Sequence, residues 1–213
     1  EIIEALLDMK RSFGGMSIEF TSLVIAEYEA IKRLFNITNG LSLDIGGDQT
    51  MMLFTKAGVL TSCTAFGIGA HYFIERIAET LHISVEEAEH LNRQYLDTAV
   101  AASDIAQLKT LLENEVGVWN EGFLRALDNL YHIGPLPETV LLGGDGALIP
   151  EIIDLVRQGR WMENRALATK PDLKILNGYD VFGGNSLDGH LQGPDDLGLA
   201  TLMYYSLHHE PIF

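Results

Sequence analysis

The sequence is poor in basic residues and has one cysteine, and each shortage excludes a class of protein. Lys and Arg total 14 against 30 Asp and Glu, a formal net charge of −16 over 213 residues. A surface that binds nucleic acid through its phosphates needs excess positive charge, so we expect no nucleic-acid partner. The lone Cys63 excludes an internal disulfide and a cysteine-ligated zinc site, which suits a reducing cytoplasm. We expect Cys63 to be a small apolar core residue in a strand.

Long apolar runs are also missing. No segment approaches the roughly 20 apolar residues of a membrane-spanning helix, and no secretory signal is visible, so we expect no membrane span. The acidity has a further consequence, because a bound nucleotide would need a divalent cation beside it or basic residues from another segment. The chain begins Glu1-Ile2-Ile3 without a methionine and shows helical spacing at once. We therefore expect it to be a piece of a longer protein.

Two glycine turns about a hundred residues apart are the most informative feature present. The first runs from Asp44 through Gly46 and Gly47 to Thr50, and the second contains Gly143, Gly144 and Gly146. A Gly-Gly turn between strands is most often a simple hairpin. Glycines at strand ends also let backbone N–H groups approach a ligand, and successive amides can bind an anion. The two turns are therefore candidates for a phosphate site.

The apolar spacing predicts a chain of mixed α/β type. Strands are expected at 41–45, 51–55, 59–66, 139–142 and 173–176, the first three with the spacing of an antiparallel meander. We expect helices at 1–13, 21–35, 70–81, after Ser84, at 118–131, 148–156 and 196–207, with a strand at 16–20. Residues 97–117 are expected to form a less regular helical insertion, and 177–193 a glycine-rich loop. Trp119 and Phe123, at helical spacing, are expected in the core.

This order of elements resembles the second half of the actin-like ATPase fold, shared by actin, the Hsp70 chaperones, sugar kinases and the bacterial proteins FtsA and PilM. The segment Leu43–Thr50 is similar to the second phosphate motif of that superfamily, and Val140–Pro150 to its adenosine motif. Phe66–Gly69 with the following helix, Ile83–Glu89 and Leu197–Ala200 resemble the FtsA and PilM branch in particular. The resemblance covers about residues 16–207.

The resemblance implies domain II of an actin-like ATPase, which is ribonuclease H-like, with a mixed sheet whose three-stranded antiparallel meander is flanked by helices. Residues 1–38 would be a helix–strand–helix segment leading in from domain I. Residues 39–213 would be domain II, with a small helical insertion at about 84–117. The first phosphate motif and its connecting helix would lie in the other half, which this chain lacks.

The resemblance also implies a binding site for ATP with Mg²⁺. Its residues would be Asp44, Gly46, Gly47, Thr50, Gly143, Gly144 and Gly146, with Asp44 orienting water on the metal. Asp48 and Gln49 stand where the superfamily commonly has a glycine and a threonine, and Asp145 adds a carboxylate to the second turn. Because carboxylates repel polyphosphate, we expect an ATP binder with weak or absent hydrolysis, inactive as this chain alone.

The function implied is that of the nucleotide-binding half of a bacterial scaffold protein of the FtsA or PilM type. Such a protein would assemble with itself, or with cell-division or type IV pilus proteins, at the inner membrane. It would be cytoplasmic and reach the membrane through other regions or partners. Two alternatives stay open: a degenerate actin-like interaction domain without nucleotide, and half of a sugar or acetate kinase. The absence of a clear acceptor-binding aspartate motif disfavours the kinase.

Overall fold

A computed structural model describes residues 21–97, 102–130, 139–159, 172–183 and 190–208, together with Glu4, Asp8, Arg11, Ser12 and Trp161. The helix predicted at 1–13 lies mostly outside the described residues, and the strand predicted at 16–20 lies wholly outside them. The proposed division at residue 38 and the proposed insertion at about 84–117 stay predictions.

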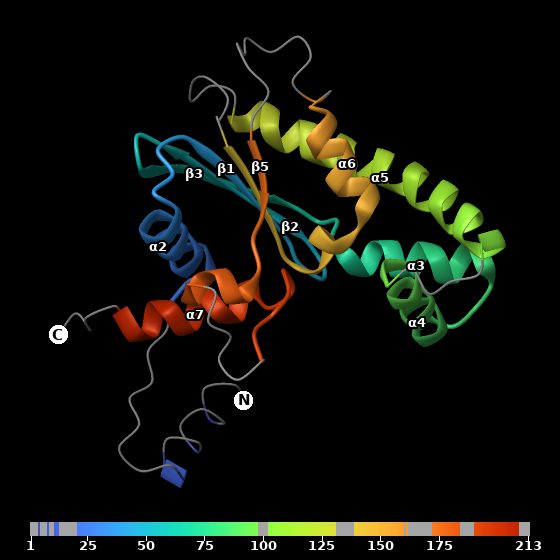
Figure 1. The fold of residues 1–213 in the computed structure, drawn as a ribbon, viewed down its shortest axis with the longest axis horizontal. Helices are drawn as coiled ribbons and strands as arrows, with labels where there is room; N and C mark the ends of the chain where they lie inside the picture. Colours follow the sequence, from blue (N-terminus) through green and yellow to red (C-terminus); the bar gives the residue numbers. More distant parts are fainter. Residues whose placement is uncertain are drawn as a thin grey trace.

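A five-stranded mixed sheet forms the centre of the molecule (Figure 1), with strand order β3-β2-β1-β4-β5. Strands β1 (Gly40–Ile45), β2 (Thr50–Lys56) and β3 (Val59–Phe66) pair antiparallel, which confirms the predicted meander. Strands β4 (Thr139–Gly143) and β5 (Asp172–Ile175) continue the sheet in parallel with β1. The sheet therefore places the two glycine turns on neighbouring strands.

Helices cover both faces of the sheet (Figure 1). Alternation along β1 and β4 sends Leu41, Leu43 and Leu142 into one core and Leu141 into the other. The first core contains α3 (Ala70–Leu81), α5 (Ala102–Leu130) and α6 (Pro150–Gln158). The second contains α2 (Leu23–Phe35) and α7 (Leu197–His208). Helix α4 (Val85–Leu96) packs beside α3 at one end of the molecule.

The local helix signals are mostly confirmed. Ser84 and Glu87 form a complete capping box at the start of α4, each bonding the other's backbone N–H. Ser22 occupies the N-cap position of α2, although its side chain makes no capping hydrogen bond. Trp119 and Phe123 lie in the core with stacked rings 5.2 Å apart, as predicted for their spacing.

The less regular segment predicted at 97–117 is helical over residues 102–117, as expected, but the predicted irregularity and the separate helix at 118–131 are wrong. Helix α5 runs without a break from Ala102 to Leu130. Its apolar stripe continues through Leu108, Leu112, Val116 and Trp119, all buried. A Cβ at Gly117 would meet nothing within 4 Å, so this glycine lies on the outer side of the helix. It reduces the stability of the helix only through the low helix propensity of glycine.

Three further boundaries differ from the predictions. Gly143 belongs to β4, and residues 145–148 form a 3₁₀ helix, η2 (Asp145–Leu148), so α6 starts at Pro150 rather than at Leu148. Proline fits the first helical position because its missing N–H has no helical partner there. The expected loop after residue 177 contains a second 3₁₀ helix, η4 (Gly178–Phe182).

The expectation for Cys63 is also wrong, because the side chain is exposed. Strand β3 is an edge strand whose residues alternate between exposed and half-buried positions. Cys63 falls on the exposed set. Composition and strand propensity do not reveal which strand lies at a sheet edge.

Candidate functional site

The two glycine turns meet at one end of the sheet. Asp44 near the end of β1 lies opposite Gly143 at the end of β4, and the two strands are parallel. Because parallel neighbours end at the same edge, the turn after Ile45 and the turn after Gly143 are adjacent. We call this end of the sheet the glycine edge.

Gly144 is the residue that brings the two turns into contact. Its φ is +82°, a conformation that side chains disfavour. A Cβ there would lie 2.3 Å from Asp44 Oδ1 and 2.6 Å from the Ile45 carbonyl oxygen. Added Cβ atoms at Gly143 and Gly146 would likewise lie 2.2 Å from side-chain carbons of Leu197 and Ile45. The second turn therefore requires its glycines for packing against β1 and α7.

The first turn is fixed to the start of α3. The carbonyl oxygens of Gly46 and Gly47 accept hydrogen bonds of 2.8 Å from the N–H groups of Ala70 and His71. The Gly46 N–H donates to the Gln49 carbonyl over 3.0 Å, so this amide closes the turn. Two orphan donors at the N-terminus of α3 are thus satisfied by the turn, which holds the helix against the glycine edge.

Thr50 lies at the start of β2 and is fully buried. Its hydroxyl donates to the Ile68 carbonyl over 2.7 Å and accepts from the Trp119 indole N–H over 2.9 Å. Thr50 therefore connects the glycine edge to the loop before α3 and to the core of α5. In this arrangement the Thr50 hydroxyl stabilises the fold below the first turn.

A pair of buried carboxyl groups lies behind the first turn. Glu27 of α2 is 1% exposed, and its side chain hydrogen-bonds Asp44. Burial, followed by the Asp44 charge and hydrogen bond, raises the pKa of Glu27 to about 9. Burial also raises the pKa of Asp44, against the lowering effect of the Glu27 hydrogen bond. Glu27 is thus the protonated partner, while its Oε1 is buried without a hydrogen-bond partner.

More carboxylates follow along the glycine edge, and one histidine faces them. Burial and the nearby charge of Asp195 raise the pKa of Asp145. Asp48 hydrogen-bonds His71 over 3.0 Å and raises the pKa of that imidazole. His71 also lies so close to the first turn that a Cβ at Gly47 would be 2.7 Å from its Cε1. The edge is therefore strongly negative, with His71 as a titratable cation beside it.

The negative edge decides what chemistry it can support. A free polyphosphate would be repelled by Asp48, Asp145 and the buried pair unless a cation lies between them. Among the described residues, no three His, Cys, Asp or Glu side chains are grouped so as to hold a metal ion by themselves. The residues present fit a cation that arrives together with an anion, so that the anion's oxygens and water complete the coordination.

Most of the predicted site residues come together here. Asp44, Gly46, Gly47, Gly143, Gly144 and Gly146 all lie at the glycine edge, and Thr50 lies below it. The sequence reasoning missed Glu27, His71 and Asp195. Glu27 had a usable signal, because it is a carboxylate within the apolar stripe formed by Ala26, Ala30 and Ile31. Asp195 comes from a distant loop, and the sequence around it gave no comparable signal.

Comparisons with known proteins agree with this fold. No protein-family model matches the chain, and no curated protein matches it. Among solved structures, the chain is similar to one from a PilM-PilN type IV pilus biogenesis complex, with 19% identity and a TM-score of 0.61. That match covers 98% of this chain and 58% of the other.

Two further structures are similar. An MreB of Spiroplasma citri bound to AMPPNP matches with 14% identity and a TM-score of 0.58, over 97% of this chain and 63% of that chain. The ethanolamine utilization protein EutJ of Carboxydothermus hydrogenoformans matches with 17% identity and a TM-score of 0.52, over 82% and 54% respectively. The chain thus spans less than two thirds of the length of each. The likeness confirms the predicted actin-like ATPase fold.

Proposed function

We propose that the chain is the nucleotide-binding half of a bacterial actin-like scaffold protein of the FtsA or PilM type. The observation that carries this proposal is the meeting of two glycine turns at one sheet edge, with Asp44 opposite Gly143. Asp44, Gly46, Gly47, Gly143, Gly144 and Gly146 would face the nucleotide. Thr50 would hold the first turn in place through its bonds to Ile68 and Trp119. The similar MreB structure is bound to AMPPNP, which supports a nucleotide as the ligand of this fold.

The nucleotide would bind as a complex with Mg²⁺. Asp44 would act on the metal through water, and the metal would supply the positive charge that the glycine edge lacks. The residues of this chain would orient the groups that bind the nucleotide. The buried Glu27 holds the Asp44 carboxyl in place, and the Gly46 and Gly47 carbonyls hold the start of α3. The remaining contacts would come from a second domain.

We expect the chain alone to hydrolyse ATP weakly or not at all. Asp48 and Asp145 would oppose the charge that develops on a transferred phosphoryl group, so we expect weak ATPase activity at most. The same carboxylates favour one alternative function, an actin-like interaction domain that binds no nucleotide.

The partners would be other copies of the protein, or proteins of cell division or type IV pilus assembly at the inner membrane. The similar structure from a PilM-PilN complex supports a protein partner of the second kind. None of the helices in the described part of the chain has the length and apolar character to cross a bilayer. We infer a cytoplasmic protein that reaches the membrane through partners or other regions.

The test is a titration with a fluorescent ATP analogue, using this chain and a longer form that carries the second domain. We expect saturable binding only when Mg²⁺ is present. Asp44→Asn should weaken it at least about tenfold, the effect of losing one charged interaction. Glu75→Gln, an exposed carboxylate on α3, is the control and should leave affinity unchanged. If the longer form shows no saturable binding with Mg²⁺, the interaction domain without nucleotide becomes the better assignment.

A further inference from the structure

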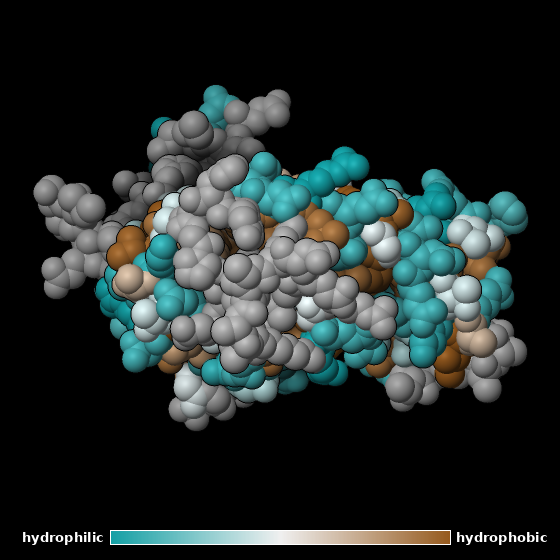
Figure 2. Space-filling view, turned by 90° about the horizontal axis from the view of Figure 1, so that it is seen from above, coloured by the Kyte–Doolittle hydropathy of each residue, from teal (hydrophilic) through white to brown (hydrophobic). Residues whose placement is uncertain are grey.

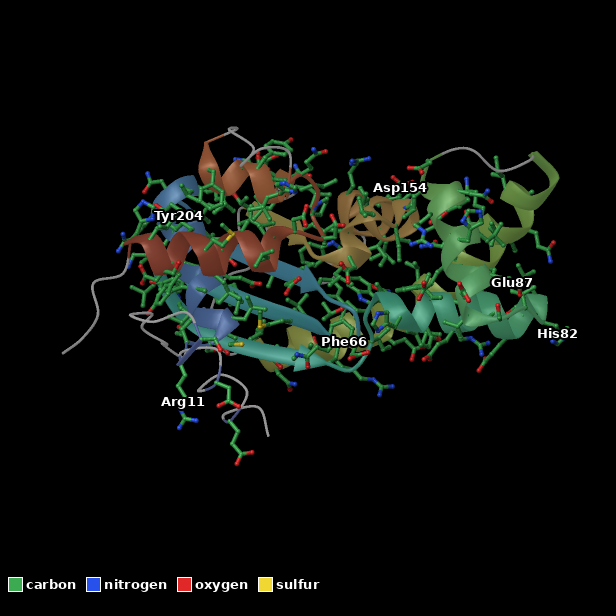
Figure 3. All side chains as sticks on the ribbon, turned by 90° about the horizontal axis from the view of Figure 1, so that it is seen from below. Arg11, Phe66, His82, Glu87, Asp154 and Tyr204 are labelled. Atoms are coloured by element: carbon green, nitrogen blue, oxygen red, sulfur yellow. The ribbon has the colours of Figure 1, made fainter. Side chains whose placement is uncertain are left out.

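A groove between α5 and α6 lies outside the glycine edge. It has a volume of about 750 Å³, and residues of both helices line it together with Tyr95 of α4 and Trp161. None of the predicted nucleotide residues lines it. Helix α6 has nine residues, so the groove extends about 14 Å along it at 1.5 Å per residue. Figure 3 labels Asp154, a lining residue of α6, beside α5.

The groove contains a carboxylate whose burial is not compensated. Glu151, in the first turn of α6, is only 9% exposed. The Tyr95 hydroxyl donates a hydrogen bond to Glu151 Oε1, but Oε2 is buried and has no partner. Asn120 Oδ1, also in the groove, is buried without a partner too. A buried acceptor without a donor is unfavourable, so both positions favour a ligand that brings N–H donors.

The other charges of the groove are already paired. Lys109 lies 3.9 Å from Glu113, one turn along α5. Asp154 lies 3.5 Å from Arg157 on α6. Among the described residues, the structure gives Glu151 no basic partner. Within the described part of the groove, Glu151 is therefore the charged side chain that lacks a partner of opposite charge.

Apart from Gln158, the remaining residues that line the groove are apolar. Val116 and Trp161 are buried, and Leu124 and Leu155 are half-buried. The Trp161 indole donates to the Val156 carbonyl over 3.0 Å and packs edge-on to Phe123, so this wall is fixed. Viewed from above the molecule, hydrophobic side chains are exposed between hydrophilic ones (Figure 2). An occupant must therefore combine a cationic group with an apolar body.

We propose that this groove binds a peptide segment of a partner protein through an arginine or lysine side chain flanked by apolar residues. The basic group would donate to Glu151 Oε2 and Asn120 Oδ1, and the flanking residues would cover Leu124 and Leu155. About four extended residues, at roughly 3.4 Å each, match the length of α6. A small amine could reach Glu151 but would leave Leu124 and Leu155 exposed to solvent. The net charge of −16 also attracts a basic segment.

The test uses the full chain and a mixture of hexapeptides with one fixed central residue and Leu, Val, Phe or Ala elsewhere. The fixed residue is arginine, lysine, glutamate or citrulline, the uncharged analogue of arginine. We expect the arginine or lysine mixtures to be retained about 10- to 100-fold better than citrulline, the effect of a charged hydrogen bond. Equal retention of the citrulline mixture on the unaltered chain would overturn the proposal, whatever any variant does.

Two variants locate the binding. Glu151→Gln keeps the shape and the Tyr95 hydrogen bond but removes the charge, and it should abolish the preference for arginine over citrulline. Glu121→Gln on α5 is the control, because Glu121 is exposed, pairs with Arg125 and does not line the groove. Its effect should stay below about threefold. A preference that survives Glu151→Gln contradicts the proposal.

Competition distinguishes the other possible occupants. Spermidine that displaces the peptides at equal concentration would indicate a site for small amines instead. AMPPNP with Mg²⁺ that displaces them would show the groove to be part of the nucleotide site. We expect neither to compete. Because this result does not depend on nucleotide affinity, it holds or fails separately from the proposed function.

Discussion

At the scale of single residues, the pairing of Glu27 with Asp44 makes the site sensitive to pH. The pKa of Glu27 is raised from 4.5 to about 9, chiefly by burial. Between these two values the folded chain binds a proton that the unfolded chain releases. The stability that this group contributes is therefore complete below pH 4.5 and is lost as the pH rises toward 9.

Replacing Glu27 with Gln should remove this dependence. We expect the free energy of unfolding of the unaltered chain to fall between about pH 5 and pH 8, by at most about 1.4 kcal/mol per pH unit. Glu27→Gln should flatten the slope, because glutamine does not titrate. Urea unfolding at several pH values measures it. Glu29→Gln on the same helix, a half-exposed residue that pairs with Arg33, should retain the slope. Equal slopes in both variants would contradict the buried pair.

Gly144 offers a second test of the glycine edge. Gly144→Ala would bring a Cβ within 2.3 Å of Asp44 Oδ1, in addition to the strain of φ +82°. We expect a loss of about 2 to 4 kcal/mol of unfolding free energy, the sum of backbone strain and a steric clash. Gly58→Ala is the control, with φ +71° and no atom within 4 Å, and should cost only about 1 kcal/mol. Equal losses in chemical denaturation would show that the turns do not touch.

Residue types indicated much of this edge before the structure did. The glycines and Asp44 follow apolar runs, and strand ends are where a backbone turn exposes its amides. Glu27 and Asp195 were not found, because a one-dimensional pattern does not show which helix or loop packs behind a turn. Thr50 lies beside the first turn, but its burial under Trp119 depends on α5, which lies some 70 positions later.

At the scale of elements, α5 shows where sequence reasoning fails and how to test the result. An exposed glycine in a helix interior costs about 1 kcal/mol relative to alanine. Gly117→Ala should therefore stabilise the chain by about 0.5 to 1 kcal/mol in urea unfolding, since nothing lies within 4 Å of the added Cβ. Gly117→Pro should destabilise it by about 3 kcal/mol or more. If proline were tolerated, α5 would be broken near Gly117.

The elements that were predicted well share one property, which is that their signals are local. The meander depends on alternation and short turns, and α4 begins at a capping box contained in four residues. The errors concern long-range packing. A boundary was predicted between residues 117 and 118, although the buried stripe from Leu108 to Phe123 continues across it. Cys63 alternates like any strand residue, but only the sheet order shows that β3 is at an edge.

At the scale of the whole molecule, negative charge is concentrated where the fold places its glycine turns. The first turn brings Asp44 and Asp48, the second Asp145, and Asp195 approaches from the loop before α7. These carboxylates come from segments far apart in the sequence. Folding brings them close together, so they repel one another more strongly in the folded chain than in the unfolded chain. Such repulsion is retained in proteins mainly where a ligand relieves it.

Removing this repulsion should stabilise the folded chain in the absence of any ligand. The double variant Asp145→Asn with Asp195→Asn should raise the thermal midpoint by about 2 to 4 °C at low salt, equivalent to roughly 1 kcal/mol for a chain of this size. The gain should shrink at about 0.5 M NaCl, where the Debye length is only about 4 Å. Calorimetry at the two salt concentrations measures both effects. Glu75→Gln removes an exposed charge elsewhere and should change the midpoint by less than about 1 °C at either concentration. A double variant that behaves like Glu75→Gln would mean that the glycine edge holds its carboxylates without strain, and that no cation is needed there.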